Sequence, residues 1–291
     1  MIDEVQYAPG LFRHLKVVVD QERQRNGAIV LTGSQPFALM RNVSESLAGR
    51  AAVVNLHGLS LAEILGAAPQ STLPQILLRG SFPELWSQPA IEAGDFHRSY
   101  VSTYLERDLR SLQQVGNLQQ FERFLRASAL RSGQLLNRAE LARDVGIAAS
   151  TAGLWLSVLE RSGLVFLLEP WFGNAGKRLS RSPKLYWRDT GLLCWLIGIG
   201  TEAELHRSPL VGAVWETFVV GRCADKWRMQ PLLARCTSGA TAAKKWIWCW
   251  SGAAASGWRM PSGASSPAPG MDSACGRWPP SFLRAPWPAP C

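Results

Sequence analysis

Metal-binding residues and long apolar runs are scarce in this sequence. The chain has four His among 291 residues, and its six Cys form no C-x-x-C pair, so a structural zinc site is not expected. The most apolar run, residues 191–200, is too short to cross a bilayer. The first residues are acidic and polar rather than basic and then apolar, which does not fit a signal peptide. These absences predict a soluble, cytoplasmic protein without a membrane partner.

Glu and Val are missing from the last quarter of the chain. No Glu follows Glu216 and no Val follows Val220, whereas residues 223–291 hold five of the six Cys and seven of the thirteen Trp. Most of the net charge of +9 also lies there: Lys and Arg outnumber Asp and Glu by 23 to 20 up to residue 222, and by 8 to 2 after it. A disordered basic tail is one interpretation, although disorder favours Glu, Lys, Ser and Gln over Trp and Cys. The other is a frameshift in a GC-rich gene, and we expect residues 223–291 to be irregular or disordered and without function.

Apolar runs alternate with helical patterns in the front part of the chain. The segments "MIDE", "GAIVLTGS" and "RAAVVN" are typical of strands, and a helical pattern follows "YAPG". Ser60 and Glu63 have the spacing of a capping box at the start of another helix. Strand, helix, strand, helix and strand predict an α/β fold of the doubly wound kind. Asp3 and Glu4 follow the first strand directly, at the carboxyl edge where ligands bind to open α/β sheets.

The run of motifs "IDEVQYAPGLFRHLKVVVD…GAIVLTGSQPFALMRNVSESLAGRAAVVNLHGLSLAEI" resembles the AAA+ family of bacterial and archaeal ATP-binding proteins that carry a C-terminal domain of unknown function. The resemblance covers residues 1 to about 222. It implies a partial P-loop NTPase sheet with a Walker B strand, and ATP and magnesium as cofactors. Asp3 would be the magnesium carboxylate and Glu4 the catalytic carboxylate. Thr32 and Ser34 would form the sensor-1 position, and Arg50 would be an arginine finger or a phosphate contact.

The phosphate-binding loop of that family is absent. No G-x-x-x-x-G-K-[ST] segment occurs in the sequence, and "GNAGKRLS" at residues 173–180 has the wrong glycine spacing. Loop amides and the loop Lys hold the β- and γ-phosphates, and the Ser or Thr binds magnesium. We therefore expect an ATPase truncated at its N-terminus, which binds and hydrolyses no appreciable ATP.

A helical region precedes the second recognisable module. The segments "DFHRSYVSTYLERDLRSL" and "LQQFERFLRASALRSG" each carry an apolar stripe at helical spacing. Arginines of the first segment could reach a nucleotide, as lid arginines do in the resembled family, or they could form a solvated face, which is the more common arrangement.

Residues 135–171 carry a helix-turn-helix pattern. Asn137 can cap a helix at residues 138–145, Gly146 supplies the turn, and a second helix is expected at residues 149–162. "LVFLLEP" and "KLYWRD" are typical of two wing strands, so the pattern predicts a winged helix. The expected shared core is Leu141, Ala142, Val145, Ile147, Leu154, Val158 and Leu159.

The sequence is compatible with either DNA or a protein as the binding partner of this module. The second helix would expose one Arg and no Lys, which is poor for reading DNA. The expected wing is better, because it carries a basic cluster that could follow a phosphate backbone. That cluster is Lys177, Arg178, Arg181 and Lys184.

The resemblance further implies a nuclease-like domain that begins near residues 210–221, with Glu216 as its first acidic residue. No acidic cluster follows Glu216, so that site is not expected to assemble. The expected domain ranges are 1–75 for the ATPase part, 76–130 for the helical lid region, 131–200 for the winged helix, 201–222 for the nuclease-like start and 223–291 for the tail. Two hypotheses follow: an inactive remnant of an AAA+ ATPase, or a winged-helix module that binds DNA or protein.

Overall fold

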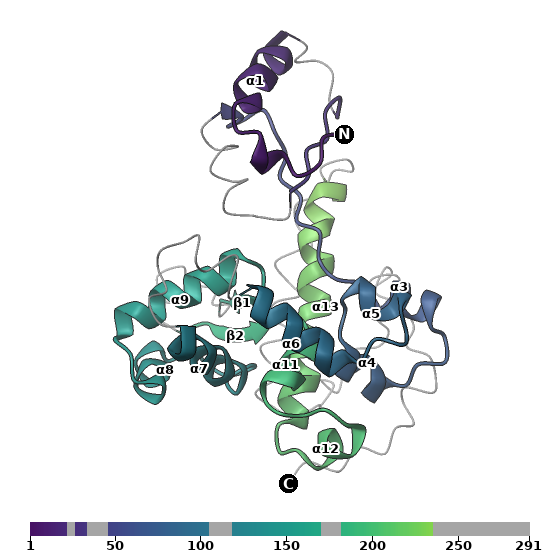
Figure 1. Ribbon diagram of the computed structural model, residues 1–291, viewed down its shortest axis with the longest axis vertical. Helices are drawn as coiled ribbons and strands as arrows, with labels where there is room; N and C mark the ends of the chain where they lie inside the picture. Colours follow the sequence, from purple (N-terminus) through teal and green to yellow (C-terminus); the bar gives the residue numbers. More distant parts are fainter. Residues whose placement is uncertain (22–26, 34–45, 105–117, 170–181, 235–291) are drawn as a thin grey trace, which may run out of the picture.

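The computed structural model describes residues 1–21, 27–33, 46–104, 118–169 and 182–234. In these ranges the chain is mostly helical, with one two-stranded sheet. A small N-terminal unit stands apart from a larger helical body, and residues 51–60 run between them (Figure 1). The tail was expected to be irregular over residues 223–291, but its first part, residues 223–234, is helical. From residue 235 onward it lies outside the described residues, as do Ser34, Lys177, Arg178 and Arg181.

The N-terminal unit contains a parallel pairing and one long helix. Ile2 pairs with Leu31, and the pairing is held by Ile2 N to Val30 O at 2.8 Å and Thr32 N to Ile2 O at 2.9 Å. A 3-10 turn, η1 (Val5–Tyr7), and helix α1 (Leu11–Gln21) follow the first segment. The described part of this unit has a small core. Its buried members are Val5, Phe12, Leu15 and Leu47.

The expected α/β sheet is therefore only partly formed in the described residues. The first two predicted strands meet in a single bridge, and residues 51–57, where the third was expected, have no regular structure. Val54 is 59% exposed and Leu56 is 97% exposed. An apolar strand of a parallel sheet is stable only when neighbours cover its faces, and within the described residues these two side chains are mostly left exposed.

Four short or medium helices begin the larger body: α3 (Leu61–Ala67), α4 (Leu73–Arg79), α5 (Pro83–Ser87) and α6 (Ala93–Tyr104). Ser60 and Glu63 form the predicted capping box of α3, and Thr72 and Gln75 form a second one at α4. The Ser60 contacts lower the pKa of Glu63, because both of them favour its charged form. Local sequence therefore fixes where these helices start.

Three helices and a hairpin form the next module: α7 (Leu118–Ala129), α8 (Arg138–Val145), α9 (Ala149–Arg161), β1 (Val165–Leu168) and β2 (Lys184–Trp187). Asn137 accepts a hydrogen bond from Glu140 N at 3.2 Å, and Gly146 has φ 77°, as its turn requires. The strands are antiparallel, with Val165 opposite Trp187. Leu135 adds a bridge on the other side of β2. The predicted helices and strands of this region are thus present.

The chain continues through α11 (Thr190–Leu196), α12 (Glu202–Arg207) and the long helix α13 (Val211–Ala234). Asp189 caps α11 by accepting from Leu192 N at 2.8 Å, and it also accepts from Ser81 N at 2.6 Å. Helix α11 crosses the end of α4 closely here, because a Cβ on Gly191 would lie 2.7 Å from the carbonyl oxygen of Arg79. Only glycine allows this approach.

One continuous core extends from Ile64 to Phe218. It spans the segments expected as lid, helix-turn-helix and nuclease-like start. One predicted core position is wrong, because Leu154 is 51% exposed. Trp155 takes the inner position on α9, with its ring 5.1 Å from Phe121 and 5.4 Å from Phe124. Among the described helices, none is long and apolar enough to span a membrane.

Candidate functional site

Asp3 and Thr32 meet at the carboxyl ends of the two paired N-terminal segments. The pairing of Ile2 with Leu31 places them side by side, and the Thr32 hydroxyl donates to Asp3 Oδ1. The same oxygen accepts from Glu4 N at 3.0 Å. Asp3 is exposed, so its carboxylate remains open to solvent. Two residues that are 29 positions apart in sequence are thus brought into one polar group.

Glu4 has an unusual backbone conformation. Its φ of 49° and ψ of 40° lie in the left-handed region. In the described part of the chain, Glu4 is the only non-glycine residue with a positive φ. For a residue with a Cβ this conformation costs about 1 kcal/mol. The Glu4 carboxylate accepts from Gln6 Nε2, and Gln6 is buried. The strained turn therefore directs Glu4 toward Gln6.

Arg50 is held by a carboxylate of α1. Its Nε lies 2.8 Å from Asp20 Oδ1 and its Nη2 lies 3.1 Å from Asp20 Oδ2. The hydrogen bond with Asp20 is the main reason that the pKa of Arg50 is raised. This two-pronged pairing fixes the guanidinium geometry. The contact of Arg50 with a phosphate stays a prediction.

Lys184 and Glu216 form an ion pair between β2 and α13. The Lys184 ammonium lies 2.8 Å from Glu216 Oε1, and the Tyr186 hydroxyl donates to the same oxygen at 2.6 Å. Burial, with Glu216 as a second cause, raises the pKa of Tyr186 far above its ordinary value of 10. Lys184 therefore has a carboxylate partner inside the protein. The other three members of the predicted basic cluster, Lys177, Arg178 and Arg181, lie outside the described residues.

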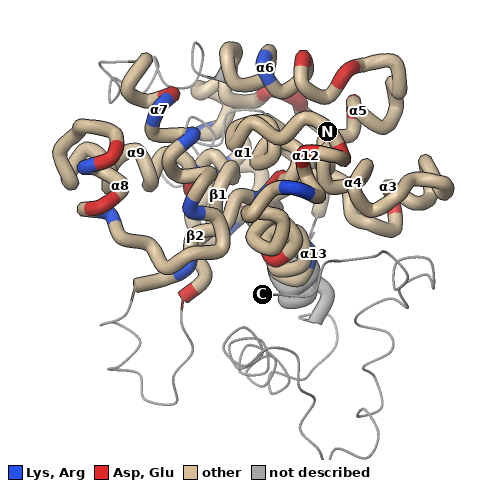
Figure 2. Tube along the Cα trace, turned by 90° about the horizontal axis from the view of Figure 1, so that it is seen from below, with Lys and Arg blue, Asp and Glu red and all other residues tan. Residues whose placement is uncertain are grey.

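Charges of both signs alternate along the helices of this region. Figure 2 shows Lys and Arg interspersed with Asp and Glu over α6 to α9. On α8, Arg138 and Arg143 alternate with Glu140 and Asp144. Arg131, in the turn after α7, pairs with Asp144. No stripe of a single sign runs along the described part of these helices.

Residues 1–65 match an AAA domain. Residues 70–203 match a domain of unknown function, DUF8612. The chain is also 38% identical over 232 residues to an uncharacterized protein of Mycobacterium tuberculosis and to one of Mycobacterium bovis. These matches cover 79% of this chain and 52% of each relative, so the chain spans about half the length of the curated relatives it matches. No solved structure gives a significant match.

The described residues that match an AAA domain offer one carboxylate for magnesium but no group that holds the phosphates of ATP. Mg²⁺ is usually held by one or two carboxylates together with substrate phosphates. Asp3 offers one carboxylate, while Glu4 is engaged with Gln6. Among the described residues, no three His, Cys, Asp or Glu side chains lie close enough to hold a metal ion. No phosphate-loop motif occurs in the 291 residues, so Asp3 has no loop beside which to complete a magnesium–phosphate cluster.

Two further side chains were not singled out from the sequence. Gln6 holds the Glu4 carboxylate, and its own Oε1 has no hydrogen-bond partner within the described ranges. His97 is buried in the helical body, and neither of its ring nitrogens has a hydrogen-bond partner among the described residues. A polar residue two positions after the acidic pair is a weak signal for Gln6. No local signal in the sequence indicates the burial of His97, because helices from distant parts of the chain form its environment.

Proposed function

We propose that the N-terminal unit provides the carboxylate side of an AAA-type ATP site. In this proposal Asp3 is the magnesium carboxylate, Glu4 is the catalytic carboxylate, and Thr32 with Ser34 forms the sensor. The match of residues 1–65 to an AAA domain supports it. The observation that carries it is the hydrogen bond from Thr32 to Asp3, because the Walker B carboxylate and the sensor must lie on adjacent strand ends.

The proposal includes a limit on activity. The 291 residues contain no loop whose amides and Lys could hold the phosphates. We expect a polypeptide of this sequence to show no saturable ATP binding below about 1 mM and no ATP hydrolysis above background, since Asp3 alone supplies little binding energy.

The test is a calorimetric titration of the full chain with ATP and magnesium, together with a phosphate-release assay. Asp3→Asn keeps the shape of the side chain and the bond from Thr32 but removes the charge. Any residual magnesium-dependent binding should disappear in this variant and remain in Asp95→Asn, which changes an exposed acid of the helical body. Micromolar binding by the wild-type chain would contradict the proposed inactivity. Residual binding that Asp3→Asn leaves intact would contradict the role of Asp3.

A second candidate function is a winged-helix module at residues 131–200. The succession of α8, α9, β1 and β2 within this range supports it, with α7 directly before the range. The bridge of Leu135 to β2 also supports it, since a winged helix pairs its hairpin with a short strand that precedes the helix-turn-helix. The mixed charge of α8 and α9 and the pairing of Lys184 with Glu216 favour a protein partner over DNA. Leu154, half exposed on α9, offers an apolar contact for such a partner.

A further inference from the structure

The helical body holds the end of the linker, residues 51–60, on two sides. Leu59 N donates to Ser81 O at 2.8 Å, and the Leu59 carbonyl accepts from Arg222 Nη1 of α13. Gly58 lies against the same serine, because a Cβ on Gly58 would come within 2.3 Å of Ser81 Oγ. Residues 51–57, by contrast, have no regular structure. The body therefore grips the linker at Gly58 and Leu59.

Ser81 passes this contact on to the first turn of α11. Its N and its Oγ both donate to Asp189 Oδ2, at 2.6 and 2.7 Å. The other carboxylate oxygen, Asp189 Oδ1, accepts from Leu192 N at 2.8 Å and so caps α11. Hydrogen bonds thus run without a break from Leu59 through Ser81 and Asp189 to Leu192.

These contacts form a clasp, which consists of Gly58, Leu59, Ser81, Asp189 and Arg222. Its packing is tight on both sides of Ser81. A Cβ on Gly80 would lie 2.3 Å from Asp189 Oδ1, and one on Gly191 would lie 2.7 Å from the Arg79 carbonyl oxygen. Close-packed groups pass a displacement on to their neighbours, because no empty space takes it up. A movement of the linker end therefore acts on Asp189.

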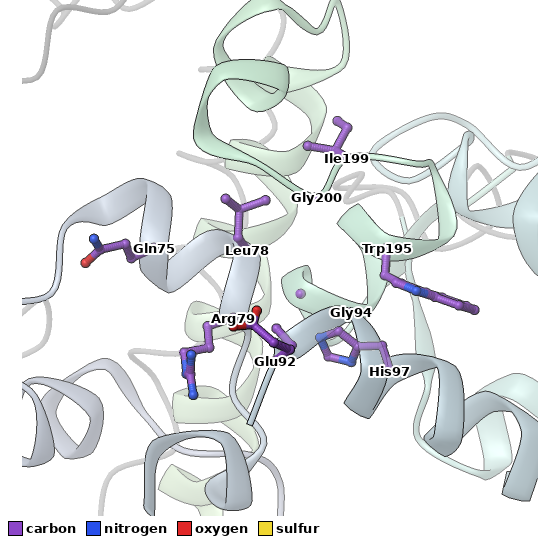
Figure 3. A pocket seen from close by; sticks show the side chains of 11 residues that line it. Gln75, Leu78, Arg79, Glu92, Gly94, His97, Trp195, Ile199 and Gly200 are labelled. Carbon is purple, nitrogen blue, oxygen red and sulfur yellow. The ribbon is translucent and has the colours of Figure 1, made fainter. Parts of the chain in front are cut away.

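Helix α11 has space beside it. A hollow of about 200 Å³ lies between α4, α6 and α11, and its lining includes Leu78, His97 and Trp195 (Figure 3). Gly191, in the first turn of α11, also lines it. The helix can therefore shift when Asp189 moves, whereas the clasp itself has no room to absorb the movement.

The clasp also joins the two parts of the chain that match different families. Gly58 and Leu59 belong to residues 1–65, which match an AAA domain, and Ser81 and Asp189 belong to residues 70–203, which match DUF8612. We propose that the clasp couples these two parts: a displacement of the linker end at Leu59 passes through Ser81 to Asp189 and moves α11. This coupling rests on the fold and not on ATP binding, so failure of the proposed ATP site leaves it intact.

The first test adds a methyl group on the linker side of the clasp. In Gly58→Ala the new Cβ pushes Ser81, so the bond between Leu192 N and Asp189 should open more often. Amide hydrogen exchange of the full chain, measured by mass spectrometry on peptides that contain Leu192, should be about fivefold faster than in the wild type, the effect of losing one hydrogen bond. The matched control is Gly66→Ala on α3, where a Cβ would meet nothing within 4 Å. The control should exchange as the wild type does, and unchanged exchange in Gly58→Ala overturns the proposal.

A second substitution tests the path through Asp189. An amide has a single carbonyl oxygen, so Asp189→Asn can accept from Ser81 or from Leu192 but cannot serve both with separate oxygens, as the carboxylate does. In this background Gly58→Ala should change the exchange of Leu192 by less than about twofold, because the path is already interrupted. An equal effect of Gly58→Ala in both backgrounds would show that the displacement bypasses Asp189, which contradicts the proposal.

A third variant is milder and keeps the proposal testable if the first one does not fold. Ser81→Ala removes only the hydroxyl that donates to Asp189. Coupling is reciprocal, so the amides of Leu59 and Leu192 should both exchange about threefold faster. Ser87→Ala is the control, because its hydroxyl bonds within α5, and it should change neither amide. Faster exchange at Leu192 with wild-type exchange at Leu59 would mean that the two sides of the clasp are not coupled.

Discussion

At the scale of single residues, His97 shows how the fold alters a side chain. It is buried among aromatic rings, and burial lowers the pKa of its imidazole below the ordinary 6.5, while the charge of Asp189 opposes part of that effect. Two buried polar atoms without partners cost about 1–3 kcal/mol each. Asp189 itself has no such deficit, because Ser81 and Leu192 donate to its carboxylate.

We predict that His97 makes the protein less stable in acid. The unfolded imidazole binds a proton as the pH falls through about 6.5, whereas the folded one binds it only at lower pH. The contribution of His97 is therefore complete above about pH 6.5 and is lost as the pH falls toward the folded pKa, at up to about 1.4 kcal/mol per pH unit. His97→Phe should remove this slope and be at least as stable as the wild type at neutral pH, since it keeps the ring and removes the unpaired nitrogens.

Urea denaturation of both proteins at about pH 7, 6 and 5 measures the difference. His14→Gln, which removes an exposed imidazole on α1, serves as the control for losing a histidine elsewhere. The same pH dependence in the wild type and in His97→Phe would contradict the prediction.

At the scale of elements, α13 supplies a carboxylate that binds the basic residue of β2. Lys184 belongs to the basic cluster predicted for the wing, but Glu216 of α13 binds its ammonium group. A positive charge that is already paired adds little to phosphate binding, because releasing it requires breaking the internal pair. The other three basic residues of the cluster, Lys177, Arg178 and Arg181, lie outside the described residues.

The winged-helix candidate therefore predicts a difference between two lysines. In fluorescence anisotropy with a labelled duplex of about 20 base pairs, Lys177→Ala should lower the slope of log K against log salt by about one, the value for one lost phosphate contact. Lys184→Ala should leave the slope unchanged within about 0.3. Equal losses in both variants would show that Lys184 reaches DNA despite Glu216. No measurable binding by the wild type would favour the protein partner.

At the scale of the whole molecule, the buried clusters of the described residues differ greatly in size. The core of the helical body runs from Ile64 to Phe218, whereas the N-terminal cluster has four buried members within residues 1–21, 27–33 and 46–50. Residues 51–57 between them have no regular structure. A small cluster removes little apolar surface from water, so it opens more often than a large core.

Amide hydrogen exchange should reveal this difference. We predict that amides of α1 exchange at least about tenfold faster than those of α7, α9 and α11 in the native protein, because opening the N-terminal unit breaks few apolar contacts. Mass spectrometry of peptides from the full chain measures both regions in one experiment. Equal protection of α1 and α11 would mean that the two cores unfold as one cooperative unit.

Local signals in the sequence were sufficient for many element boundaries. The capping box at Ser60, the cap at Asn137 and the glycine turn at Gly146 each involve contacts within four residues, so each could be predicted without knowing the fold. The inner face of α9 could not be predicted fully. Leu154 and Trp155 are both apolar, and Trp155 is inside because Phe121 and Phe124 of α7 meet it there.

The sequence by itself determined the acidic pair at residues 3 and 4, the absence of a phosphate loop, and the order of helices and strands in residues 118–187. Tertiary structure alone decided that Thr32 binds Asp3, that Asp20 holds Arg50, that Glu216 neutralises Lys184, and that His97 is buried beside a hollow. The physical reason is range. Caps and turns are satisfied by neighbours in the chain, whereas the charge and burial of a side chain depend on groups that only folding brings close.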